Sequence, residues 1–188
     1  MKNFILSIIF VGISIVGLAQ EHLSFKGIPI EGSMSEFCQK LRAKGFTHMN
    51  TDNNLTLFNG DFTGRKAVVG VKATDDGKDV YSVVVFFDES EEWSTLVNTY
   101  DYYKHIYSRK YGNPTQSTEH NPSHSDSNLG LMHELNQGTV TWISSWSAIG
   151  GSIDVSISKS GIYRGRVVIV YRDTQNTEAK IQKDIDDI

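Results

Sequence analysis

Three histidines are the side chains of this sequence best suited to hold a metal ion. His120 and His124 lie in a polar stretch, next to Glu119, and His133 follows soon after. Imidazole and carboxylate groups together are ligands for zinc and other transition metals. Pro122 lies between the first two histidines, so a helix does not place their rings on one face. The sequence gives a candidate metal site at His120, His124 and His133, but a solvated loop is the favoured interpretation.

Trp142 and Trp146 form a second candidate site, for a ligand. They are four residues apart and share a face if both lie on one strand. An exposed pair would suit a sugar ring or a partner protein. A buried pair would belong to the core, and this alternative is favoured because large aromatic side chains are mostly buried.

Signatures of catalysis are otherwise weak. The chain has many serines but no G-x-S-x-G motif. The residues around Cys38, the only cysteine, do not match a thiol-protease signature, so we expect this side chain to be a small buried hydrophobe. Gly60 and Gly64 lack the Lys-Ser/Thr that follows in a phosphate loop. No catalytic residue and no cofactor is expected.

The first 19 residues predict export. They contain one lysine, an apolar run from Phe4 to Val16, and small residues at Gly17 and Ala19, as in a signal peptide cut after Ala19. A single domain at 20–188 would remain, with no membrane span, in the periplasm or secreted. Lys2 is one of the 18 basic residues, so the mature chain has 17 basic and 22 acidic residues and a net charge of −5. This charge argues against nucleic acid or an anionic membrane as the main partner.

One long amphipathic helix, from Ser90 to Pro114, organises the rest of the chain. Its apolar residues recur at steps of three and four, as on one face of a helix. Asp88 or Ser90 is the expected N-cap, and Gly112 with Pro114 ends the helix. The inward face is expected to hold an aromatic core: Trp93, Leu96, Val97, Tyr100, Tyr103, Tyr107 and Tyr111.

A second helix begins after Ser33, which forms a capping box with Glu36, and it ends at Lys44 and Gly45. Alternating or continuous apolar residues predict the strands, and a polar loop and a short terminal helix complete the chain. The expected strands are 55–62, 66–74, 80–87, 131–135, 139–146, 152–158 and 166–172, with the loop at 115–128 and the helix at 176–188.

These elements predict an α+β fold, an antiparallel sheet with the helices packed on one face. Two segments, 33–89 and 90–173, each begin with a capped helix that ends in a basic residue and a glycine. About three strands follow in each, and the last is strongly apolar. The pattern predicts a tandem α-β-β-β duplication.

The opening FKGIPIEGSMSEFCQKLRAKGF, from Phe25 to Phe46, resembles a group of uncharacterised exported bacterial proteins with the pattern F-K-G-I-P-I-x-G, a capped helix and K-G-F. The stretches 57–64, 110–114 and 151–157 are similar to that group too. This resemblance implies export but no activity. The layout of helix and sheet repeats also resembles β-lactamase-inhibitor-like architectures, at the level of layout alone.

The leading functional hypothesis is an exported, non-enzymatic domain that binds a protein or an envelope component. It depends on the weak catalytic signatures and on a strand-rich, acidic body without disulfides. The alternative is a small metal-dependent hydrolase that uses the histidine-containing loop.

Overall fold

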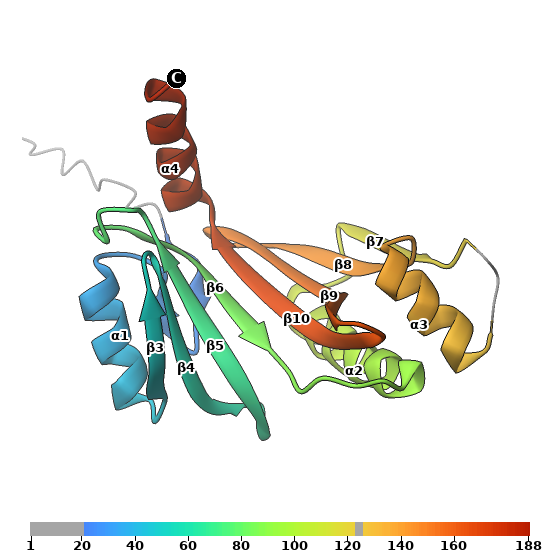
Figure 1. Cartoon of the computed structure of the whole chain (residues 1–188). Coiled ribbons are helices and arrows are strands. Elements are labelled where there is room, and N and C mark those ends of the chain that lie inside the picture. Colours follow the sequence, from blue (N-terminus) through green and yellow to red (C-terminus); the bar gives the residue numbers. More distant parts are fainter. Residues whose placement is uncertain (1–20, 123–125) are drawn as a thin grey trace, which may run out of the picture.

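The computed structural model describes residues 21–122 and 126–188. The predicted signal peptide and His124 lie outside these residues. A small hairpin pairs β1 with β2, and the other strands form one antiparallel sheet of eight, in the order β3-β4-β5-β6-β10-β9-β8-β7 (Figure 1). The predicted α+β fold is confirmed. The elements are β1 (Ser24–Phe25), β2 (Ile28–Pro29), α1 (Met34–Ala43), β3 (Thr47–Asp52), β4 (Leu55–Phe62), β5 (Arg65–Ala73), β6 (Val80–Phe86), α2 (Trp93–Tyr111), β7 (Gln116–His120), α3 (Asn128–Gln137), β8 (Thr141–Ala148), β9 (Gly151–Gly161), β10 (Arg164–Asp173) and α4 (Thr174–Asp186).

The N-terminal cap of α1 has the expected chemistry. The Ser33 hydroxyl accepts a hydrogen bond from the Glu36 amide at 3.3 Å, and the Glu36 carboxylate accepts one from the Ser33 amide at 3.1 Å. This capping box fixes the start of a helix that buries Phe37, Cys38 and Leu41 against the sheet.

The long helix α2 presents the predicted aromatic face to the core, where Trp93, Leu96, Tyr100, Tyr103 and Tyr107 are buried. Its predicted start is wrong. The cap position is Glu92, which makes no side-chain cap bond. The side chain of Asn128, at the start of α3, instead accepts a hydrogen bond from the Trp93 amide at 2.7 Å. A residue far along the chain therefore caps the helix.

The region between α2 and β8 differs from the prediction. Residues 131–135 belong to the helix α3 rather than to a strand. Ser127 caps α3 through its hydroxyl, and Gly138 ends it in the left-handed conformation. A short apolar run does not distinguish a strand from a helix by periodicity. The expected loop 115–128 contains β7, and the unpredicted β3 has six exposed residues, so neither edge strand carries an apolar signal.

The helices α1, α2 and α3 all contribute to the main core, on one face of the sheet. α4 projects from one end of the sheet (Figure 1) and buries none of its residues. Each half of the chain supplies a helix and then four strands of the large sheet, with α3 inserted between β7 and β8 in the second half. β6 pairs with β10 where the halves meet. No helix in the described part of the chain is long and apolar enough to cross a membrane.

Candidate binding face

The sheet has a second face, opposite α1, α2 and α3, which we call the open face. The strand register identifies the residues on this face, since residues paired across an antiparallel ladder point to the same side. Val68 pairs with Phe86, and Phe86 pairs with Val168, which in turn pairs with Ser156. Alternation along each strand then assigns every second residue to the open face.

An apolar cluster occupies the middle of the open face. A Cβ added at Gly70 would meet the side chains of Leu55, Leu57 and Phe86 at 3.2 to 3.5 Å, so these three converge over Gly70. None of the cluster's residues belongs to the main core. Val84 and Val168 are nevertheless buried, and the others are half-buried. We call these residues the open-face cluster: Leu55, Leu57, Val68, Val84, Phe86, Val168 and Val170.

Charged side chains flank the open-face cluster on neighbouring rows. Arg166 forms an ion pair with Glu89, and its guanidinium lies 5.8 Å from the Phe86 ring centroid. Arg172 forms an ion pair with Asp154. An apolar centre with a charged rim is the usual composition of a protein–protein interface.

The far side of the open face, on β8 and β9, has a different chemistry. Hydroxyl groups outnumber aliphatic side chains here, although Ile143 pairs with Ser156 on the same face, and most of these residues are half-buried. Serines pair across the ladder, as Ser147 does with Ser152. The open face therefore changes from apolar to hydrogen-bonding across its width, with hydroxyls at Ser145, Ser147, Ser152, Ser156 and Ser158.

A hollow of about 660 Å³ lies at one end of the open face. The strands β4, β5, β6 and β10 all contribute to it, together with the segment that follows β6. Its lining includes the charged residues Asp61, Lys66, Asp88, Glu89 and Arg166, and the rings of Phe86 and Phe87. Its volume is within the range of ligand pockets, about 300 to 1,000 Å³.

The two tryptophans singled out in the sequence point to the helix side of the sheet. Trp146 is 1% exposed and donates from its indole nitrogen to the Gly112 carbonyl at 3.1 Å. Trp142 is half-buried, and its ring packs edge-on against Trp93, with the centroids 5.1 Å apart. Both belong to or contact the core, so neither offers an open platform for a sugar ring.

The histidines of the candidate metal site are distributed over separate elements. His120 is exposed at the end of β7, and His133 lies in α3, where its ring stacks against Tyr163. His124 lies outside the described residues. Within residues 21–122 and 126–188, no three His, Cys, Asp or Glu side chains are grouped so as to hold a metal ion.

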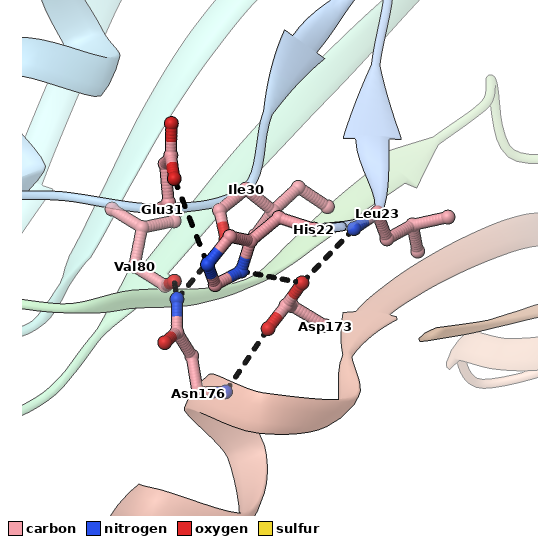
Figure 2. Close-up of polar contacts among 7 residues, drawn as sticks. All are labelled: His22, Leu23, Ile30, Glu31, Val80, Asp173 and Asn176. Carbon is pink, nitrogen blue, oxygen red and sulfur yellow. Dashed lines mark hydrogen bonds and ion pairs between the residues drawn. The ribbon is translucent and has the colours of Figure 1, made fainter. Parts of the chain in front are cut away.

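A buried polar cluster joins the start of the described chain to its end (Figure 2). The Asp173 carboxylate is fully buried and accepts hydrogen bonds from the amides of Leu23 and Asn176, both at 3.0 Å. It also lies 3.0 Å from Nδ1 of His22, whose Nε2 lies 3.6 Å from Glu31. An aspartate that orients a histidine occurs in nucleophilic triads. Here the other ring nitrogen faces a carboxylate and not a nucleophile, so the cluster fastens two chain segments.

The same junction excludes side chains at Gly150. A Cβ there would lie 2.1 Å from the Glu21 carbonyl oxygen and 2.5 Å from the Leu23 amide nitrogen. Gly150 has a φ of +78°, which also favours glycine. The first described residues therefore lie directly on the turn between β8 and β9.

A hydroxyl network fastens β7 and β8 beneath α2. Tyr100 and Ser144 are fully buried, and their hydroxyl oxygens lie 2.6 Å apart. Ser117 lies 2.8 Å from Ser144, and Lys104 pairs with Glu119 at 2.5 Å. Burial raises the pKa of Tyr100, and its bond to Ser144 partly opposes this shift. Because Ser144 is inaccessible, this network stabilises the strand pair and offers no nucleophile.

The single cysteine is also inaccessible. Cys38 is 5% exposed, and burial raises the pKa of its thiol. A thiol in this environment remains protonated and is a weak nucleophile.

Comparisons with protein-family models, with curated proteins and with solved structures found no match to this chain. The functional argument therefore depends on the geometry alone. The residues of the open face were not predicted from the sequence. Identifying them requires the register and the pairing of β6 with β10, which join segments 82–86 and 168–172.

Proposed function

We propose that this protein is an exported, non-enzymatic domain that binds a partner protein through the open face of its sheet. The observation that carries the proposal is the open-face cluster, an apolar surface separate from the core and rimmed by charges. Export remains the expectation from the signal-like first 19 residues.

The dimensions of the open face agree with this role. Its eight strands average eight residues in length. With about 4.8 Å between strands and about 3.4 Å per residue, they present roughly 1,000 Å². One partner of a standard protein–protein interface contributes about 800 Å². A single globular partner could therefore cover the open-face cluster and its charged rim together.

The metal-dependent alternative gains no support from the described residues, because His120 and His133 do not meet a third ligand there. The buried state of Cys38 and Ser144 likewise leaves no accessible nucleophile at either position. Binding explains an apolar cluster on a sheet face better than catalysis does.

The test is cross-linked capture by the full-length protein in its native envelope, compared with two variants. Val170→Lys places a charge in the open-face cluster. Leu129→Lys introduces the same residue at a position in α3 that is 73% exposed, on the helix side. Thermal unfolding first establishes that both variants fold.

We expect one discrete protein to be captured by the wild type and by Leu129→Lys, and lost with Val170→Lys. Equal capture by all three proteins would refute the open face as the binding surface. Substrate turnover that a single change in a pocket abolishes would refute the non-enzymatic role.

A further inference from the structure

The sheet divides between β5 and β6 at the end that carries the hollow. The pairing of these strands runs from Ala73 with Val80 to Val68 with Phe86, and stops there. The chain after Phe86 follows β10 instead. The Phe87 amide donates to the Val167 carbonyl at 3.1 Å, and a bridge of two hydrogen bonds joins Ser90 to Gly165. The lower end of β5 and the segment after β6 run apart in Figure 1.

The end of β5 forms one wall of this division, and the segment after β6 forms the other. Each wall has a main-chain edge without a neighbouring strand. Residues 65–67 of β5 pair with β4 on one side, and among the described residues no main chain pairs with them on the other. Residues 87–90 pair with β10 on one side, and among the described residues no main chain pairs with them on the other side. Unpaired edges are templates for another strand.

The space between the walls reaches through the sheet. The hollow of about 660 Å³ opens on the open face, and a second of about 470 Å³ lies on the helix side. Lys66, Phe87, Asp88 and Glu89 line both. Residues of α2 also line the hollow on the helix side, and both hollows are open to solvent. We call this space the slot.

Charged side chains on the two walls do not pair with one another across the slot. Arg65 and Lys66 lie on the β5 wall, with Asp61 of β4 beside them. Asp88 and Glu89 lie on the other wall, with Arg166 of β10 beside them. No ion pair among the described residues joins the two walls, and Glu89 pairs with Arg164 and Arg166 instead. At the same end, Nε of Arg166 is buried without a hydrogen-bond partner. The slot therefore offers donors and acceptors that its own walls do not satisfy.

We propose that the slot binds an extended segment of a polypeptide partner. A strand presents N–H and C=O groups on both of its sides, so it can bond to both free edges at once. The free edge of β5 is three residues long, which corresponds to about 10 Å of extended chain. The rings of Phe86 and Phe87 supply apolar contact. This inference rests on the proposed function and names the part of the partner that enters the open face.

The test uses a displayed library of random seven-residue peptides, selected on the full-length protein. Binding of the strongest peptide is measured by fluorescence anisotropy to the wild type and to two matched variants. Asp88→Trp fills the slot. Asp186→Trp makes the same change at an exposed position of α4, at the opposite end of the sheet from the slot. Both positions are exposed, so both variants should fold.

We expect Asp88→Trp to weaken peptide binding by roughly tenfold or more, and Asp186→Trp to leave it unchanged. N-methylation of any central peptide amide should reduce binding, because successive amides face alternate walls and both walls are bonded. Failure to select any peptide, equal binding to both variants, or tolerance of N-methylation at every position would each overturn the proposal.

The two proposals fail separately. If Val170→Lys abolishes capture of the native partner while Asp88→Trp does not, the open face is the binding surface and the slot is not used. If neither change affects capture, the proposed function itself is wrong.

Discussion

The first half of the molecule covers its part of the sheet with α1 through Phe37, Cys38 and Leu41, whereas the second half uses α2 and a row of tyrosines. On the open face, the first half and the centre carry the apolar open-face cluster, whereas the far side carries hydroxyl groups. In the second half, polar groups are therefore found in the core as well as on the open face.

This contrast indicates how each half is stabilised. The first half depends mainly on apolar burial, although Thr56, Thr74 and Ser82 are also buried there. The second half adds directional bonds, such as those of Tyr100 with Ser144 and of Tyr107 with Tyr171. Burial raises the pKa of both tyrosines of the second pair, so they act as neutral hydrogen-bonding groups. The predictions below test this difference.

The largest effect is expected from Phe58→Ala in the first half. Phe58 is fully buried, with the Arg42 guanidinium 6.0 Å from its ring centroid. Truncation removes apolar contact and leaves a cavity, so we expect a loss of about 3 to 5 kcal/mol in the free energy of unfolding. Urea denaturation measures this loss. A cost below about 1 kcal/mol would contradict a first half held by apolar burial.

The next effect concerns the junction that closes the molecule. Asp173→Asn keeps the size of the side chain but leaves one acceptor oxygen for three donors, and its NH₂ group would face another donor. We expect a loss of about 2 to 3 kcal/mol in unfolding free energy. Asp154→Asn is the matched control on the open face, where the aspartate pairs with Arg172. Its expected cost is about 1 kcal/mol or less. Equal losses of unfolding free energy in the two variants would show that the buried junction stabilises the fold no more than the ion pair on the open face.

A smaller effect is expected from Tyr100→Phe in the second half. The change removes the hydroxyl bonded to Ser144 but keeps the ring, and Ser144 retains its contact with Ser117. We expect a loss of about 1 kcal/mol. Tyr102→Phe is the control, since Tyr102 is 40% exposed. If both changes were neutral, the hydroxyl network would not be what distinguishes the second half.

The smallest effect is expected at the turn between β5 and β6. The Thr74 hydroxyl and then the Lys78 amide donate to Asp76 and lower its pKa from 3.8 to about 2. Because the folded pKa lies below the unfolded one, the stabilisation is present above about pH 4 and is lost as the pH falls to about 2. The melting temperatures of wild type and Asp76→Ala should therefore differ slightly at neutral pH and converge at pH 2. A difference that persisted at pH 2 would contradict this cause.

Much of the fold could be predicted because its signals are local. Ser33 and Glu36 specify a cap within one turn, and the tyrosine spacing specifies the buried side of α2. The apolar runs of β6 and β10 predicted strands, and these strands form the middle of the sheet. The prediction of a strand at 131–135 was wrong because a short apolar run fits a strand and a helix equally well. Ser127 and Gly138, which cap α3, are single-residue signals that did not decide between them.

The candidate site could not be predicted because it depends on relations between distant segments. The open-face cluster draws on β4, β5, β6 and β10, and the sequence does not state that Val84 lies opposite Val170. The slot depends on the chain leaving β5 after Phe86 to follow β10. Residues 80–87 are apolar on both faces, which is typical of a covered strand. In the structure one of those faces belongs to the open face, opposite α1, α2 and α3.

The junction of His22, Leu23 and Gly150 with Asp173 has a consequence for the timing of assembly. A chain that emerges N-terminus first, from a ribosome or through a membrane, presents residues 21–24 about 150 residues before the groups that hold them. Contacts of such long sequence separation form late. Residues 22 and 23 therefore gain their bonds to Asp173 only when the last strand joins the sheet.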